Sequence, residues 1–227
     1  MFMIEIIYGV ILALFHYFNE VIDKKVHKYK TEVMSLSAGV AVAYIFLVLF
    51  KELFEVEMFT PYLLIVVLFG FSLLHVVEKH VYQHKSRKRK LRELKEIHSI
   101  SFFIYHFFLG IVLYYFVQES FRSGLFFFIP IFLHSVLSGI SLSEIDSKVR
   151  ESGIVKLLLS LAPIFGIVLA MVVTIPVWVY SCILAFVLGV LIYVVIRDQI
   201  PYKEEGNSLY FLVGVFLMLL LLLLLLS

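Results

Sequence analysis

Two histidines lie deep inside long apolar stretches, where a polar side chain is costly and usually has a role or a partner. His106 is near the middle of ISFFIYHFFLGIVLYYFV (residues 100–117), and His134 is within GLFFFIPIFLHSVLSGISL (residues 124–142). An imidazole can bind a metal ion, carry a proton, or hydrogen-bond a serine or carbonyl oxygen on a neighbouring helix. The choice among these roles depends on the elements that position the two side chains.

The apolar residues are gathered into runs long enough to cross a bilayer. Of the 227 residues, 62% are hydrophobic and 16% are charged, whereas a soluble domain is about 45–50% apolar and about 25% charged. Crossing a bilayer takes about 20 residues, and continuous apolar runs suit helices rather than barrel strands. The sequence predicts one all-α integral membrane domain over 1–227, with eight transmembrane helices at about 3–18, 33–50, 61–79, 98–118, 125–142, 153–173, 177–196 and 209–226.

The basic residues predict which side of the membrane each connection faces. All Lys and Arg residues except Lys51 and Arg122 fall in or beside alternate connections, and the loop 80–97 is the richest of these. Because basic loops stay in the cytoplasm, both termini are expected outside it. We interpret the loop as a topology signal, with binding of nucleic acid or anionic lipid as alternatives. Three histidines flanking the basic run give a further alternative, a loose metal site (His80, His84 and His98).

The short connection between the fourth and fifth predicted helices makes them antiparallel neighbours. At about 1.5 Å per residue, His106 and His134 then lie near the middle of the bilayer. Two imidazoles at one depth could share a metal ion or a proton path. Ser135 and Ser138 add polar groups to the fifth helix, and Ser135 with Gly139 forms a small-xxx-small pair that favours close helix approach. The structural alternative is that each histidine only hydrogen-bonds a neighbouring helix.

The stretch GVLIYVVIRDQIP (residues 189–201) resembles the seventh helix of the ZIP (Zrt/Irt-like) divalent metal transporters. That helix reads G-x-x-L-Y, then apolar residues, an acidic residue, two more positions and P-E. Here Gly189, Tyr193, Asp198 and Pro201 fit the pattern. The resemblance implies eight helices, both termini outside and a polar cytoplasmic loop after the third helix, in agreement with the topology predicted from charge.

Other stretches are similar to the family in the same order along nearly the whole chain. LSAGVAVAYIFLVLFKELFE resembles the second helix, with Glu52 in place of its terminal glutamate. YLLIVVLFGFSLLHVVEKHVYQH resembles the third, where Gly70, Phe71 and Glu78 fit, and LLSLAPIFGIVLA resembles the sixth. Each match alone is weak because apolar helices share a composition, but their order and spacing make the set more specific.

The family's metal centre is altered in this chain. Its signatures are H-N-x-x-D-G on the fourth helix and H-E-x-P-x-G on the fifth; here these read YHFFLG (105–110) and HSVLSG (134–139). His134 is kept, His106 stands where asparagine is usual, and both carboxylates are lost. Two neutral imidazoles supply no compensating charge for a dication, and zinc prefers about four ligands. The resemblance therefore implies a weakened, mononuclear or transient site.

We expect a ZIP-like membrane transporter of divalent metal ions, zinc or a related ion, acting between the fourth and fifth helices. Its expected metal ligands are His106 and His134, and its cytoplasmic-end gate is Glu78 with Asp198. The alternatives are a non-transporting scaffold or partner subunit, and a transporter of another solute in which the histidines carry protons. No enzyme activity and no firm cofactor are expected, with Zn²⁺ or another divalent ion as substrate. The remaining pathway residues are Tyr105, Gly110, Ser135, Ser138 and Gly139.

The expected surroundings follow from the same reading. The partners are the lipid bilayer and the transported ion, nucleic acid is not expected, and a homodimer is left open. The expected location is the cell (plasma) membrane.

Overall fold

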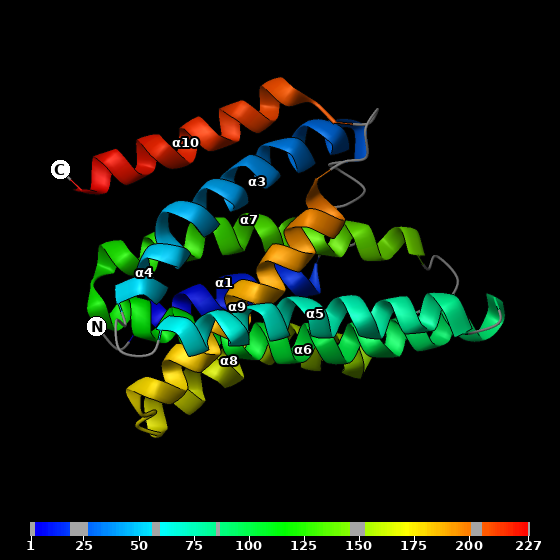
Figure 1. Cartoon of the computed structure of the whole chain (residues 1–227), viewed down its shortest axis with the longest axis horizontal. Coiled ribbons are helices and arrows are strands. Elements are labelled where there is room, and N and C mark those ends of the chain that lie inside the picture. Colours follow the sequence, from blue (N-terminus) through cyan, green and yellow to red (C-terminus); the bar gives the residue numbers. More distant parts are fainter. Residues whose placement is uncertain are drawn as a thin grey trace.

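The computed structural model describes residues 3–18, 27–55, 60–84, 87–145, 153–200 and 206–226, and over these residues the secondary structure is helical, with no strand (Figure 1). The predicted all-α class is thereby confirmed for this part of the chain. Five stretches within it are long and apolar enough to cross a membrane: Lys30–Glu55, Pro61–His80, Ser99–Glu119, Gly153–Val172 and Val177–Arg197. They indicate a membrane-embedded protein.

Each predicted span overlaps a helix. Two of the predicted spans include a π-helical turn. One is Ile45–Leu49, between α3 and α4, and the other is Val195–Gln199, after α9. A 3₁₀ turn at His27–Tyr29 leads into α3. The helices are α1 (Ile4–Tyr17), α3 (Lys30–Tyr44), α4 (Phe50–Glu55), α5 (Thr60–His84), α6 (Arg87–Glu119), α7 (Phe121–Ile145), α8 (Gly153–Val172), α9 (Val177–Val194) and α10 (Ser208–Leu226).

The stretch predicted as a basic loop, 80–97, is mostly helix. α5 continues to His84, and α6 begins at Arg87, so both helices extend past their apolar segments. The physical reason is composition, because the stretch is rich in Lys, Arg, Glu and Leu and lacks Gly and Pro. Reasoning from polarity placed the end of the apolar run correctly but took it for the end of the helix.

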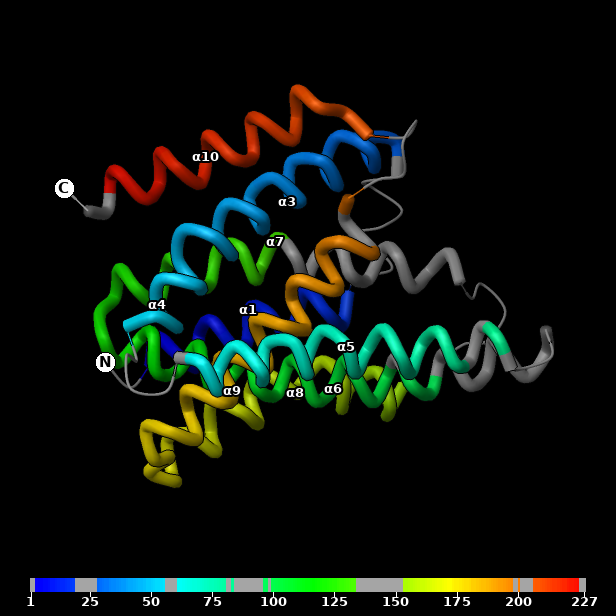
Figure 2. Tube along the Cα trace, viewed as in Figure 1, coloured from blue at the N-terminus to red at the C-terminus, as the bar shows by residue number. Residues whose placement is uncertain are grey.

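Three helix pairs make the most extensive contacts, and their partners are far apart in the sequence: α3 with α10, α5 with α9, and α6 with α8. The trace in Figure 2 follows α3 and α10 side by side along one edge of the molecule. The leucine-rich α10 is largely exposed away from α3, with Leu220, Leu223 and Leu224 each more than half exposed. This exposure agrees with a helix that faces lipid.

Each of these helix pairs contains one glycine on each helix, and each glycine faces the backbone of the partner helix. A Cβ added to Gly110 would lie 2.0 Å from the carbonyl oxygen of Pro163, and one added to Gly166 would lie 1.9 Å from that of Phe107. In every pair the facing carbonyl belongs to the residue three positions before the partner glycine. Such small residues let helix backbones touch in a membrane. The three reciprocal glycine pairs are Gly39 with Gly214, Gly70 with Gly189, and Gly110 with Gly166.

The arrangement also repeats between the two halves of the chain. After α3 a π-helical turn begins at Ile45, six positions after Gly39, and after α9 another begins at Val195, six positions after Gly189. If α3 corresponds to α9 and α5 to α10, the pair α3–α10 corresponds to the pair α9–α5. Both helix pairing and local helix geometry therefore indicate an internal repeat.

The centre of the bundle is filled by large side chains. Phe127 on α7 is fully buried, and its ring packs 4.8 Å from that of Phe116 on α6 and 6.2 Å from that of Tyr44 on α3. Leu109 and Ile131 are equally buried beside them. This packed layer fixes α6 and α7 relative to one another and so positions His106.

Candidate functional site

His106 lies in the interior of the bundle, on the buried side of α6. Its side chain is 1% exposed, and its ring stacks on that of Phe102 with centroids 3.8 Å apart. The ring atom Nδ1 is 2.9 Å from the carbonyl oxygen of Phe102, one turn earlier. Because a carbonyl only accepts, Nδ1 must donate, and in a neutral imidazole Nε2 then carries the lone pair. Metal-binding histidines are commonly oriented in this way.

His106 contacts a titratable group on another helix, His16 of α1, which the sequence analysis missed. The two rings pack edge to face, with centroids 4.4 Å apart and planes at 89°, and His16 is 4% exposed. A signal was present in the sequence. Glu5, Tyr8, Leu12 and His16 recur at helical spacing and form the buried stripe of α1. Extending that periodicity to the end of the first helix would have placed His16 inside the bundle.

The predicted partner of His106, His134, lies on α7, and α7 does pack against α6. The side chains of residues 134–145, including His134, Ser135 and Ser138, lie outside the part of the chain that the structure describes, as does the packing around Gly139. The sharing of an ion between His106 and His134 therefore stays a prediction.

The remaining predicted pathway residues on α6 have different surroundings. Tyr105 is 4% exposed and lies beside His106, with ring centroids 5.1 Å apart. Gly110 faces the backbone of α8 at Pro163 rather than α7. Its place in the structure is that of a packing contact, since the backbone of α8 fills the space beside it.

The predicted cytoplasmic-end gate contains a polar cluster between α5 and α9. The Arg197 guanidinium is 2.7 Å from Glu78 Oε2, and the Tyr193 hydroxyl donates to the same oxygen. Arg197 also lies over the Tyr193 ring, 5.4 Å from its centroid. The π-helical turn carries both Arg197 and Asp198, whose side chain lies outside the described residues. Glu78 is thus bound to two partners on the neighbouring helix.

A buried acidic group on α1 was also missed. Glu5, in the first turn of α1, is 0% exposed and accepts a hydrogen bond from Gln118 Nε2 at the end of α6. The contacts of Glu5 with Gln118 and of His16 with His106 are thus both made between α1 and α6.

The described part of the chain holds no group of three or more His, Cys, Asp or Glu side chains close enough to bind a metal ion. At the centre of the bundle, this part of the chain places two imidazoles, those of His16 and His106, in contact. Zinc prefers about four ligands, so further donors would have to come from other side chains or from water.

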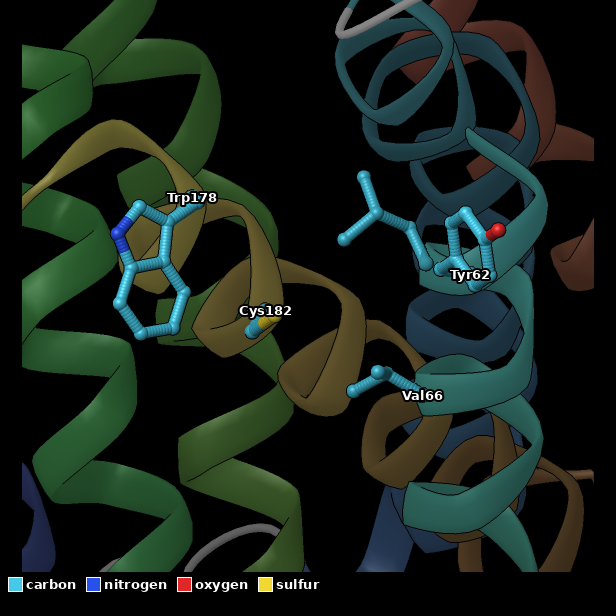
Figure 3. A pocket seen from close by; sticks show the side chains of 5 residues that line it. Tyr62, Val66, Trp178 and Cys182 are labelled. Atoms are coloured by element: carbon cyan, nitrogen blue, oxygen red, sulfur yellow. The ribbon is translucent and has the colours of Figure 1, made fainter. Parts of the chain in front are cut away.

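A separate groove of about 340 Å³ lies between the first turns of α5 and α9 (Figure 3). Tyr62 and Val66 on α5 face Trp178 and Cys182 on α9, and Leu63 also lines the groove. Its lining is apolar except for the thiol and the phenol. Among these lining side chains the thiol is a potential metal ligand, but one thiol is not the set of about four that zinc prefers, and the groove is distinct from the histidine site.

In comparisons with known proteins, no family model matches the chain and no curated protein matches it. The ZIP resemblance consequently rests on the residues quoted above.

Proposed function

We propose that this protein is a ZIP-like membrane transporter of divalent metal ions, zinc or a related ion, with altered coordination. The observation that carries the proposal is the contact between His16 and His106, two imidazoles buried on different helices of a membrane-embedded bundle. Imidazole is a ligand for Zn, Cu, Fe and Ni. The hydrogen bond from Nδ1 of His106 directs Nε2 toward the role of ligand.

The donor set favours weak and reversible binding of one ion. Neutral imidazoles do not balance the charge of a dication in a medium of low dielectric constant. His134 remains the proposed third ligand, from α7. A site of this kind binds an ion less tightly than a site with carboxylates, which suits passage more than storage.

The proposed topology has eight membrane spans, with both termini outside the cytoplasm, in the cell membrane. A labelling experiment tests it. In a Cys182→Ser background, Arg122→Cys should react with an impermeant maleimide in intact cells, whereas Lys88→Cys should react only after permeabilisation. Arg122 is exposed and lies at the start of α7, and Lys88 lies at the start of α6. The reverse pattern would invert the proposed orientation.

Calorimetry with Zn²⁺ and Cd²⁺ on the purified protein tests the proposed site. We expect saturable binding that is lost in the double variant His16→Ala/His106→Ala, because this variant removes both buried imidazoles. The comparison variant is His80→Ala, at an exposed position on α5 that belongs to the alternative histidine site of the basic stretch; it should bind as the unmodified chain does if the buried pair holds the ion, and loss of binding there would favour the alternative site. Binding that survives in a folded double variant would contradict the site. Zn²⁺ flux into proteoliposomes, abolished by the same variant, would establish transport.

A non-transporting membrane scaffold is the second candidate. It is favoured by the packed centre around Phe127 and by the backbone-to-backbone contacts of the helix pairs. For a scaffold, His16 and His106 would be a structural contact. A double variant with a lowered midpoint of thermal unfolding, in a protein that shows no metal binding and no flux, is the result expected of it.

A further inference from the structure

The helix pair α1–α6 carries a second polar contact at its outer end, which the proposed central site does not use. Glu5 Oε1 accepts a hydrogen bond from Gln118 Nε2. The other carboxylate oxygen, Oε2, is buried and has no hydrogen-bond partner among the residues that the structure describes. Burying a carboxylate in an apolar bundle is costly unless charge or several hydrogen bonds compensate.

The described neighbours do not supply that compensation. The ion pairs of Lys51 with Glu55 and of Arg197 with Glu78 do not involve Glu5. One amide donor satisfies one of the carboxylate's roughly four acceptor positions. Ionisable groups held inside a membrane bundle in this way commonly mark ion or proton pathways.

The position of Glu5 relates it to the histidines. Glu5 and His16 belong to the same buried stripe of α1, and Gln118 and His106 lie on α6, which contacts α1. At 1.5 Å per residue the two contacts are separated by about 17 Å along the helices. Gln118 is exposed, so the outer contact reaches the surface of the bundle while Glu5 does not.

We propose that Glu5 and Gln118 form an outer binding site for a divalent cation. Glu5 Oε2 supplies a negative charge, and the side-chain carbonyl oxygen of Gln118 supplies a second oxygen, since its amide nitrogen already donates to Oε1. Oxygen ligands of this kind suit hard divalent ions such as Mn²⁺. This outer site includes a carboxylate, whereas the central site is built on two imidazoles. The order of use, from Glu5 inward to His16 and His106, rests on the proposed function, whereas binding at Glu5 does not.

Binding of Mn²⁺ to the purified full chain, measured by electron paramagnetic resonance, tests the site. Glu5→Gln keeps the shape of the side chain and removes its charge, so we expect the affinity for the Glu5-bound ion to fall at least tenfold. Glu55→Gln is the matched control, because Glu55 is exposed at the outer end of α4 and pairs with Lys51; it should leave Mn²⁺ binding unchanged. Unchanged binding in a folded Glu5→Gln variant would overturn the proposal.

Two further variants keep the test decisive. If Glu5→Gln does not fold, Gln118→Ala leaves the carboxylate in place and should still weaken Mn²⁺ binding, and unchanged binding in that variant would overturn the proposal instead. The double variant His16→Ala/His106→Ala should keep the Glu5-bound Mn²⁺. If this double variant keeps the Glu5-bound Mn²⁺ and also keeps all other metal binding, the proposed central site is wrong and the outer site stands. If it loses the Glu5-bound Mn²⁺, the two sites are not separate and the outer-site proposal is wrong.

Discussion

Replacing Gly110 with alanine should lower the free energy of unfolding by about 3 kcal/mol, at the upper end of the range for overpacked cores. The added Cβ would lie 2.0 Å from the carbonyl oxygen of Pro163 and 2.8 Å from its carbonyl carbon. Both atoms belong to the backbone of α8, so no side-chain rotation can relieve the clash. α6 and α8 would have to separate, which also loosens the contact between Gly166 and Phe107. Thermal unfolding in detergent, followed by circular dichroism, measures the effect.

Gly153→Ala is the matched control for this prediction. Gly153 begins α8, the same helix that Gly110 contacts, and a Cβ added there would meet no atom within 4 Å. Since alanine is the better helix former, this variant should unfold at the same temperature as the unmodified chain or slightly above it. Equal midpoints for Gly110→Ala and Gly153→Ala would show that α6 and α8 pack less closely than described.

Replacing Glu78 with alanine should cost about 2 kcal/mol, less than the 3–5 kcal/mol typical when one partner of a fully buried ion pair is removed. The side chains of Glu78 and Arg197 are 18% and 27% exposed, so water compensates in part. The variant leaves Arg197 without its carboxylate and the Tyr193 hydroxyl without its acceptor. Chemical or thermal unfolding of the purified variant gives the change.

Two comparisons separate the pair from general damage. Arg197→Ala in the Glu78→Ala background should cost less than it does alone, because the two side chains interact. Lys51→Ala breaks the exposed Lys51–Glu55 pair, whose side chains are 65% and 58% exposed, and should have no measurable effect. Additive losses for Glu78 and Arg197 would mean that the observed ion pair contributes nothing to stability.

The helices could be predicted from the sequence because lipid imposes a simple requirement on the backbone. A run of apolar residues must satisfy its own hydrogen bonds, and so segments such as 100–117 had to be helical. The extension of α5 to His84 and the early start of α6 at Arg87 escaped the same reasoning, since both depend on helix propensity in water. The π-helical turn at Ile45–Leu49 has no signal in an apolar run.

The pairing of helices was harder to predict than their existence. Lipid is as apolar as leucine, so hydrophobicity does not say which helix contacts which. Sequence reasoning paired the neighbours α6 and α7. Among the described side chains, however, the ring that packs against His106 from another helix is that of His16, on α1. The better signals were short-range ones: the buried stripe of α1, and glycines that allow backbones to touch.

The reciprocal glycine pairs have a consequence for tracing the ancestry of the chain. At most lipid-facing positions one apolar residue can replace another over evolutionary time, so overall identity between distant homologues erodes. At Gly39, Gly70, Gly110, Gly166, Gly189 and Gly214 only a hydrogen atom fits. We therefore expect the spacing of these six glycines to outlast the rest of the sequence, and to serve as the most durable signature by which remote homologues can be aligned.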